Sequence, residues 1–246
     1  MANWSDPRPT AYAAQTQAHS AAFDAGLRAY MLSVYNYMAS AVLLTGLVAM
    51  GFSWGYENSY AYQVLSSGGP LAWLIMLSPL AVVFAMSLGQ NRMSTGTMQA
   101  LFWGFAVLMG LSLSTVFLRY TGESIATAFF ATAAGFAGLS LWGYTTKRDL
   151  SGFGTFLIMG LVGLIVASLL NLFFQSNTMS LVIAGVGVLV FAGLTAYDTQ
   201  KIKSMYAYVA GTDMMGKVVI MGALNLYLDF INMFLFLLRL FGSSRN

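Results

Sequence analysis

Asp198 and Asp229 are the two residues of this sequence whose type and setting best fit chemistry inside a membrane. Asp229 lies in the middle of the apolar run 222–242, GALNLYLDFINMFLFLLRLFG, and Asp198 lies in GLTAYDTQKIK. A carboxylate within a membrane-spanning helix is costly unless it faces protein or water, so it is by default a functional-site hypothesis. The remaining acidic residues lie in the N-terminal segment or near loops and helix ends, where solvation is easy: Asp6, Asp24, Glu57, Glu123, Asp149 and Asp213.

Three further polar residues share one side of the helix expected around Asp229. Asn225, Asn232 and Arg239 stand 4, 3 and 10 residues from Asp229, which places all four in one narrow stripe. In an alternative, purely structural interpretation, the asparagines form hydrogen bonds between helices, and Asp229 pairs with a buried cation.

The segment between the two aspartates predicts that they lie at the same depth. It is broken at 211–216, GTDMMG, the best turn candidate there. In an antiparallel hairpin closing at this turn, each aspartate lies about 15 residues, or roughly 23 Å, along its helix. The earlier helix must then continue through Lys201 and Lys203, whose long side chains can reach water or headgroups. A local salt bridge between Asp198 and Lys201 is the competing structural interpretation.

Two carboxylates close together in a medium of low dielectric constant cannot both be ionised cheaply. Such a pair titrates as a unit: it either holds a proton between its members or binds a hard cation in its place. Calcium prefers oxygen ligands. The remaining ligands of a loose shell would be backbone carbonyls and nearby polar side chains, namely Asn225, Asn232, Thr195 and Tyr197. The residues therefore predict a cation site, contested by protons, at Asp198 and Asp229.

Composition limits the class of protein. Of 246 residues, 58% are hydrophobic and only 8% are charged, with a mean hydropathy of +0.72, which indicates an integral membrane protein embedded in the lipid bilayer. The chain has no cysteine and a single histidine, so zinc, haem and Cys-His or Ser-His catalysis are excluded. We expect no enzyme activity and no cofactor. The net charge of +3 reflects basic loops, so we expect no nucleic-acid partner.

Seven apolar runs of spanning length predict an all-α integral membrane bundle of seven helices. Residues 1–27 are predicted to be a flexible cytoplasmic tail, and 28–246 the seven-helix domain. Glycines at helical spacing predict close packing of helix backbones at three pairs: Gly135 and Gly138, Gly160 and Gly163, Gly185 and Gly187. The predicted spans are Tyr30–Phe52, Leu71–Gly89, Met98–Leu118, Ser124–Thr146, Phe153–Phe174, Met179–Tyr197 and Lys217–Phe241.

Basic residues predict the orientation, because cytoplasmic loops carry an excess of lysine and arginine. With the N-terminus in the cytoplasm, three basic residues lie outside, namely Arg119, Arg239 and Arg245. The cytoplasmic side then holds the other eight, namely Arg8, Arg28, Arg92, Lys147, Arg148, Lys201, Lys203 and Lys217. Seven spans put the C-terminus outside, whereas a last segment that re-enters the membrane would return it to the cytoplasm.

The segments AYDTQKIK (196–203) and LYLDFINMFLFLLRLFG (226–242) resemble the signature of the Bax inhibitor-1, or transmembrane Bax inhibitor motif, family. The likeness extends over most of the chain, including LRAYMLSVYNYM and LVAMGF of the first span. It implies a bacterial member of the family, located in the inner membrane. The resemblance implies seven helices, with the last one central and two three-helix layers around it. It also implies a pH-sensitive calcium leak channel whose paired-aspartate sensor, for protons and calcium, is Asp198 and Asp229.

The second span departs from the pattern of calcium-conducting members. Those can have a glutamate within this span and, at its cytoplasmic end, basic residues, one of which latches onto the first aspartate. Here LAWLIMLSPLAVVFAMSLG has no acidic residue and carries Pro79, and the basic residue beyond it is Arg92. The resemblance implies the latch role for Arg92. The missing glutamate bears on conduction along the pore more than on the aspartate sensor.

Two other functions compete with a calcium leak. Intramembrane aspartyl proteases also use two aspartates on adjacent spans, but they pair a Tyr-Asp with Gly-x-Gly-Asp and a Pro-Ala-Leu segment, and this sequence has neither of the latter two. The second alternative is a modulator of a membrane-bound protease, acting through protein contact with residues 1–27. Some bacterial relatives are thought to act in this way.

Overall fold

The structure, a computed structural model, describes residues 8–245 of the chain, and the side-chain surroundings of residues 21–245. Across residues 8–245 seven helices are long and apolar enough to span a membrane, as predicted. A 3-10 helix and the short α2 lie in the loop between the first two spans, where no helix was predicted. The elements are α1 (Arg8–Phe52), η1 (Tyr56–Asn58), α2 (Tyr60–Leu65), α3 (Pro70–Gly89), α4 (Thr95–Arg119), α5 (Gly122–Thr145), α6 (Ser151–Phe174), α7 (Asn177–Val209) and α8 (Met215–Phe241).

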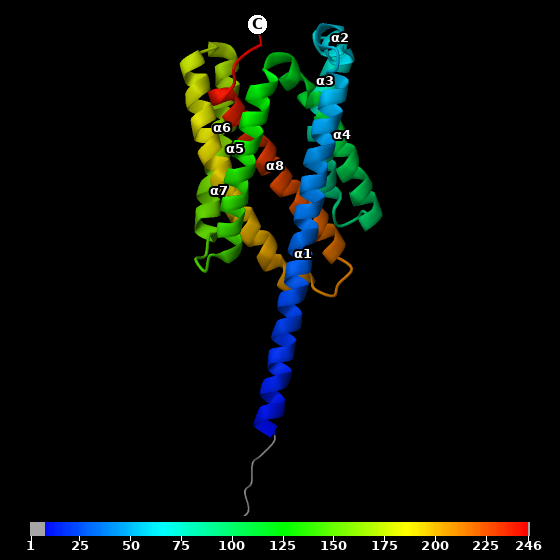
Figure 1. The fold of residues 1–246 in the computed structure, drawn as a ribbon, viewed down its shortest axis with the longest axis vertical. Helices are drawn as coiled ribbons and strands as arrows, with labels where there is room; N and C mark the ends of the chain where they lie inside the picture. The colour runs from blue at the N-terminus through cyan, green and yellow to red at the C-terminus, as the bar shows by residue number, and fades with distance from the viewer. Residues whose placement is uncertain (1–7, 246) are drawn as a thin grey trace, which may run out of the picture.

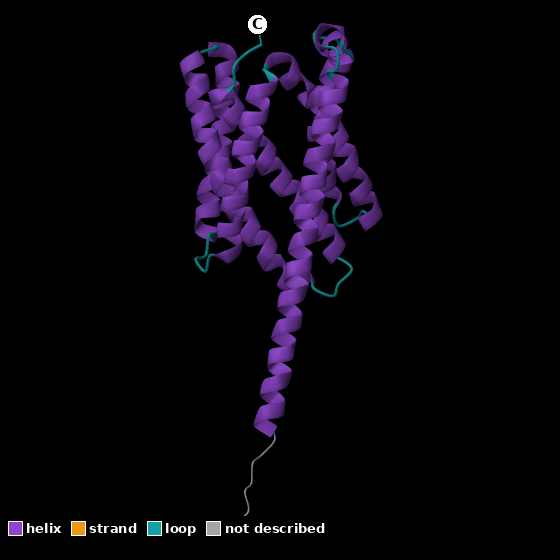
Figure 2. Cartoon of the chain, viewed as in Figure 1, coloured by secondary structure: helices purple, strands orange, loops and turns teal. Residues whose placement is uncertain are grey.

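The seven long helices form two layers with the last helix between them (Figure 1). One layer is α1, α3 and α4, the other is α5, α6 and α7, and α8 packs against α1, α4, α5 and α7. In the most apolar stretch of α8, 67% of the residues are buried inside the bundle, whereas the corresponding share is 17% for each of the outer helices α3 and α6. The predicted fold class is confirmed: an all-α membrane bundle with a central C-terminal helix (Figure 2).

Local sequence signals fix where several of these helices begin. Ser94, Thr121 and Ser176 precede α4, α5 and α7, and each side-chain oxygen accepts a hydrogen bond from the backbone N–H three residues later. These caps satisfy backbone donors that would otherwise be unpaired at a helix start. Pro70 opens α3, where its missing N–H costs nothing.

Two helices are much longer than a bilayer requires. α1 has 45 residues and α7 has 33, or about 67 and 50 Å, against a hydrocarbon core of about 30 Å. The N-terminal half of α1 extends beyond the other helices in Figure 1. Residues 8–27, within the segment predicted to be a flexible tail, are helical as part of α1. The division into a tail and a seven-helix domain stays a prediction.

The central helix α8 runs the full height of the bundle beside α4. At its start, a Cβ on Gly216 would lie 2.8 Å from the Thr95 side chain at the start of α4. At its end, Gly242 lies against Tyr120, and the backbone of Ser244 pairs with that of Tyr120, just beyond the end of α4. The C-terminus therefore lies at the opposite end of the bundle from the free half of α1 (Figure 1).

Candidate functional site: a buried aspartate pair

The α7–α8 hairpin sets the relative position of the two aspartates. Gly211, in a left-handed conformation with φ of 74°, lies in the turn between the helices, within the predicted GTDMMG segment. Above the turn, a Cβ on Gly222 would lie 3.2 Å from Ile202, and one on Gly187 would lie 2.6 Å from Phe236. These two contacts bring the helices close on either side of the aspartates, so that the carboxyl groups meet between α7 and α8.

The carboxyl groups of Asp198 and Asp229 lie close enough for the charge of one to act on the other. A hydrogen bond between two carboxyl groups requires one of them to carry a proton. Asp229 is only 4% exposed, whereas Asp198 is half-buried. Among the described residues, the Asp229 Oδ2 atom is buried and has no hydrogen-bond partner. Among residues 21–245, Asp229 is the one acidic or basic residue that is buried in the bundle.

Lys201 is the basic residue whose charge acts on Asp198. It follows three residues later on α7, is exposed, and its Nζ atom lies 5.9 Å from the centre of the Tyr197 ring. Arg92, expected to latch onto Asp198, lies in the exposed turn between α3 and α4, in the other layer of the bundle. Its latch role stays a prediction.

The four polar residues expected to support the pair differ in the direction of their side chains and in their hydrogen bonds. Asn225 and Asn232 flank Asp229 on the same side of α8, and the Asn232 amide donates to the Leu228 carbonyl at 2.8 Å. The Thr195 hydroxyl, fully buried on α7, donates to the Phe191 carbonyl at 2.8 Å.

Tyr197, the fourth of these residues, packs its ring against α6, where a Cβ on Gly154 would lie 2.2 Å from it. The structure thus directs the Tyr197 side chain toward the outer helix and does not bring it to the aspartate pair. No cluster of three or more histidine, cysteine, aspartate or glutamate side chains suited to a metal ion occurs in the searched part of the chain. Any cation ligands beyond the two carboxylates would thus be amide, hydroxyl or carbonyl oxygens.

Close approach of the helices depends on glycines that differ from most of those predicted. Gly143 of α5 makes the tightest of these contacts with the backbone of another helix, because a Cβ there would lie 2.3 Å from the Ala196 carbonyl oxygen of α7. The predicted role is wrong for four glycines, around which a Cβ would meet nothing within 4 Å: Gly135, Gly138, Gly163 and Gly185. Glycine spacing within one helix cannot reveal which face meets a neighbouring helix, and this caused the error.

A chain of three hydroxyl groups ends beside Asp198, and sequence reasoning missed it. The Tyr35 hydroxyl of α1 lies 2.6 Å from that of Ser140 on α5, which lies 2.9 Å from that of Thr199 on α7. Thr199 directly follows Asp198 in the sequence and is fully buried. The only sequence signal was a hydroxyl residue next to the aspartate. Its partners come from helices far away in the chain.

A second buried polar network holds α8 in the centre. Tyr227, fully buried two residues before Asp229, donates its hydroxyl hydrogen to Thr45 of α1 at 2.8 Å. Thr45 in turn donates to the Ala106 carbonyl of α4 at 2.9 Å. This network joins α8 to the α1–α4 layer, while the aspartate pair joins it to α7.

Arg239, the last residue of the predicted polar stripe, does not reach the aspartate pair. It is exposed near the end of α8, where its guanidinium donates to the Ser180 hydroxyl at 2.8 Å. The Asn171 amide of α6 donates to the same oxygen at 2.7 Å. Arg239 therefore connects α8 to the far end of α7, and Asp229 has no buried cationic partner on its own helix.

These features define a class: a seven-helix membrane protein whose central C-terminal helix carries a buried carboxyl group paired with a second one on the preceding helix. Residues 27–246 match the family model described as inhibitor of apoptosis-promoting Bax1. The chain belongs to this family, the Bax inhibitor-1 family.

Similar bacterial proteins cover nearly the whole chain. A protein of Rickettsia prowazekii is 49% identical over 94% of this chain and 96% of its own length. The inner membrane protein YbhL of Escherichia coli K12 is 45% identical over 90% of this chain and 94% of its own length. A protein of Caulobacter vibrioides is 44% identical over 90% and 91% respectively.

Proposed function

We propose that this protein is a pH-sensitive calcium leak pathway, with Asp198 and Asp229 as its sensor for protons and calcium. The observation that carries the proposal is the buried carboxyl pair between α7 and α8, in which the Asp229 Oδ2 atom is buried without a hydrogen-bond partner. A buried acceptor without a partner is costly, and either a proton or a cation relieves that cost.

The proposed mechanism is a competition between one proton and one calcium ion. When the pair holds a proton, the two carboxyl groups are joined by a hydrogen bond and α7 and α8 stay closed around them. When the proton leaves, two negative charges face each other at low dielectric constant, and the pair must separate or bind a cation. The Asn225 and Asn232 amide oxygens, on the same side of α8, would complete the oxygen shell.

Calcium flux into liposomes containing the purified full-length protein tests the proposal. The initial rate is measured with a calcium dye at several pH values for the wild type, Asp198→Asn and Asp229→Asn. We expect the wild-type rate to change with pH and the pH dependence to be abolished in both variants, because an amide cannot titrate. Asp213→Asn, in the exposed α7–α8 turn, removes one carboxylate away from the pair and should keep the wild-type profile. A wild-type pH profile in both sensor variants would refute the assignment.

The same assay separates a leak from the alternative role, modulation of a membrane-bound protease through the N-terminal segment. Deleting residues 1–24 removes the outer part of α1 and keeps Leu27, which is the first buried residue of α1 among residues 21–52. A leak pathway formed by the bundle should keep its flux after this deletion. Loss of flux would show that the segment is part of the activity.

We propose the inner membrane as the location, with the N-terminus in the cytoplasm. The Escherichia coli relative is named an inner membrane protein. The proposed orientation rests on the excess of lysine and arginine in the segments on the N-terminal side.

A further inference from the structure

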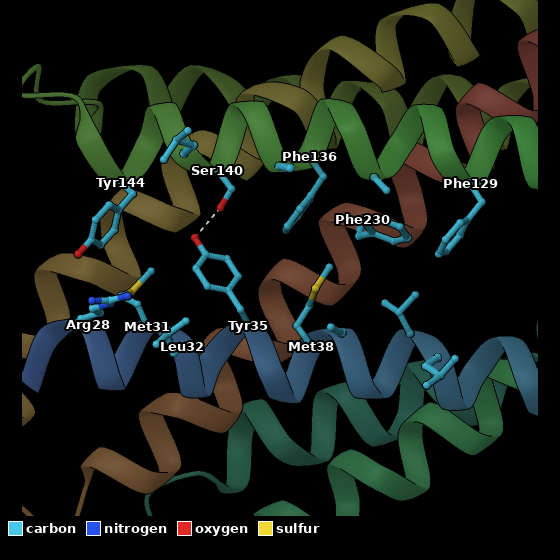
Figure 3. A pocket seen from close by; sticks show the side chains of 16 residues that line it. Arg28, Met31, Leu32, Tyr35, Met38, Phe129, Phe136, Ser140, Tyr144 and Phe230 are labelled. Carbon is cyan, nitrogen blue, oxygen red and sulfur yellow. Dashed lines mark hydrogen bonds between the residues drawn. The ribbon is translucent and has the colours of Figure 1, made fainter.

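A groove opens between α1 of one layer and α5 of the other. It has a volume of about 690 Å³ and is lined mainly by apolar side chains of α1 and α5, with Phe230 of α8 at its base (Figure 3). Four of its large apolar lining residues are exposed, namely Leu32, Leu43, Phe129 and Leu141. Because α1 and α5 are both membrane-spanning helices, the groove faces the lipid phase.

The length of the groove matches one lipid molecule. On α1 the lining residues run from Arg28 to Leu43, and on the antiparallel α5 from Tyr144 to Phe129. Both stretches correspond to roughly 22 Å of helix. Half of a bilayer with its headgroups is about 20–22 Å thick, so the groove is as long as a phospholipid from its phosphate to the end of its chains.

The two ends of the groove differ in chemistry. Arg28 and Tyr144 stand together at one end (Figure 3). Lys203 of α7 contacts Tyr144, with its Nζ atom 4.7 Å from the centre of the Tyr144 ring and 2.7 Å from the Tyr144 carbonyl oxygen. At the other end lies Phe129, and Phe136 lies midway along the groove; both pack edge-on against Phe230, with ring centres 5.6 Å apart in each pair. The groove thus has a basic entrance and an aromatic, apolar end.

We propose that this groove binds one anionic phospholipid, with its phosphate on Arg28 and an acyl chain along α1 and α5 toward Phe129. Positive charge at the headgroup level favours an anionic headgroup over a zwitterionic one. A lipid chain fits the apolar walls, where a polar ligand would lose its hydration without gaining hydrogen bonds. Tyr35 and Ser140, whose hydroxyls lead to Thr199 next to Asp198, also line the groove. The proposed lipid contacts use neither aspartate, so the proposal does not depend on the proposed calcium function.

Native mass spectrometry of the full-length protein in detergent tests this site. The protein is titrated with phosphatidylglycerol and, separately, with phosphatidylcholine of the same acyl chains. We expect one phosphatidylglycerol per chain, bound at least about fivefold more tightly than phosphatidylcholine, which corresponds to ~1 kcal/mol for one basic side chain near the headgroup. Arg28→Gln should abolish this preference. Arg148→Gln, which removes an exposed arginine just beyond the same end of α5, should retain it.

Filling the groove gives an independent test. Ala133→Trp on α5 and Ala39→Trp on α1 each add a large side chain from opposite walls, and each should abolish binding of both lipids. Ala134→Trp, exposed on α5 but outside the groove, is the matched control. Equal affinity of the wild type for the two lipids, a retained preference in Arg28→Gln, or undiminished lipid binding by a folded groove-filling variant would each overturn the proposal. Two filling variants keep the test decisive if one of them fails to fold.

Discussion

At the scale of single residues, the carboxyl group of Asp229 imposes the strictest requirement on its surroundings. It is 4% exposed, and its partner is another acid, Asp198, on the neighbouring helix. Ionised together, the two groups would repel each other in a largely buried site, where water screens charges poorly. The fully buried hydroxyl of Tyr227 lies two residues away on α8 and has a satisfied hydrogen bond. One side of α8 therefore holds the helix in place, while the other carries a group that can change its charge.

Replacing Tyr227 with phenylalanine should destabilise the bundle modestly. The variant loses the hydrogen bond to Thr45 but keeps the ring and the bond from Thr45 to the Ala106 carbonyl. Hydrogen bonds between membrane helices are worth about 0.6–1.7 kcal/mol. We expect a lower midpoint of thermal unfolding in detergent. Tyr208→Phe, at a tyrosine that is 84% exposed, should leave the midpoint unchanged. Equal midpoints for Tyr227→Phe and the wild type would show that this bond does not hold α8.

Residue type alone was enough to select Asp198 and Asp229, because carboxylates within apolar runs are rare. It was not enough for the groups around them. Tyr197 packs against α6 instead of facing the pair, and the hydroxyl of Ser140 reaches Thr199 from a distant segment. Both outcomes depend on the rotation of a helix about its own axis, which only contacts with other helices determine.

At the scale of elements, the site depends on how closely α7 can approach its neighbours. Glycine at 143 lets α5 touch the backbone of α7 at Ala196, two residues before Asp198. On the other side, Gly222 brings α8 against Ile202. The α7 segment that carries Asp198 is thus held between two close helix contacts, and the position of its carboxyl group follows from them.

A methyl group at position 143 should force α5 and α7 apart. The Cβ atom of Gly143→Ala would lie 2.3 Å from the Ala196 carbonyl oxygen, a backbone atom that cannot rotate away. Overpacking of this kind costs about 1–3 kcal/mol, and we expect a clear fall in the midpoint of thermal unfolding. Gly138→Ala, on the same helix in open space, should match or exceed the wild-type midpoint, since alanine favours helix. Similar midpoints for the two variants would argue against a tight α5–α7 contact.

The hairpin itself was predictable from the sequence, whereas its glycine contacts were not. The break at GTDMMG and the equal spacing of the aspartates depend on chain distance only, and the structure has its turn there. The glycines at 135, 138, 163 and 185 follow helical spacing too, but face open space. Spacing identifies a helix face, but what covers that face is a property of the folded bundle.

At the scale of the whole molecule, the helical bundle could be predicted from the composition of the sequence, but the central place of the last helix could not. Seven apolar runs and the short connections required a helical bundle, because an unpaired backbone is not tolerated in lipid. The central place of α8 was expected from the family resemblance alone. In the structure its burial, far greater than that of α3 or α6, agrees with its content of polar side chains.

The orientation of the bundle is open to a labelling test, because the chain has no cysteine. Asp213→Cys lies in the exposed α7–α8 turn, and Ser67→Cys lies in the exposed loop between α2 and α3, at the other end of the bundle. With the N-terminus in the cytoplasm, a membrane-impermeant maleimide added to spheroplasts should label Ser67→Cys at once, and Asp213→Cys only after lysis. The reverse pattern would invert the proposed topology.

Whether the two carboxyl groups behave as one titrating unit is the question on which the proposed function depends most directly. Infrared spectra of the purified full-length protein, recorded across a pH series, follow the protonated-carboxyl band in the wild type, Asp198→Asn, Asp229→Asn and the double variant. We predict that each single substitution shifts the titration of the remaining aspartate and that the double variant loses the part of the band contributed by these two aspartates, because interacting acids titrate as a pair. A remaining aspartate that titrates at the same pH as in the wild type, in both single variants, would contradict a shared proton.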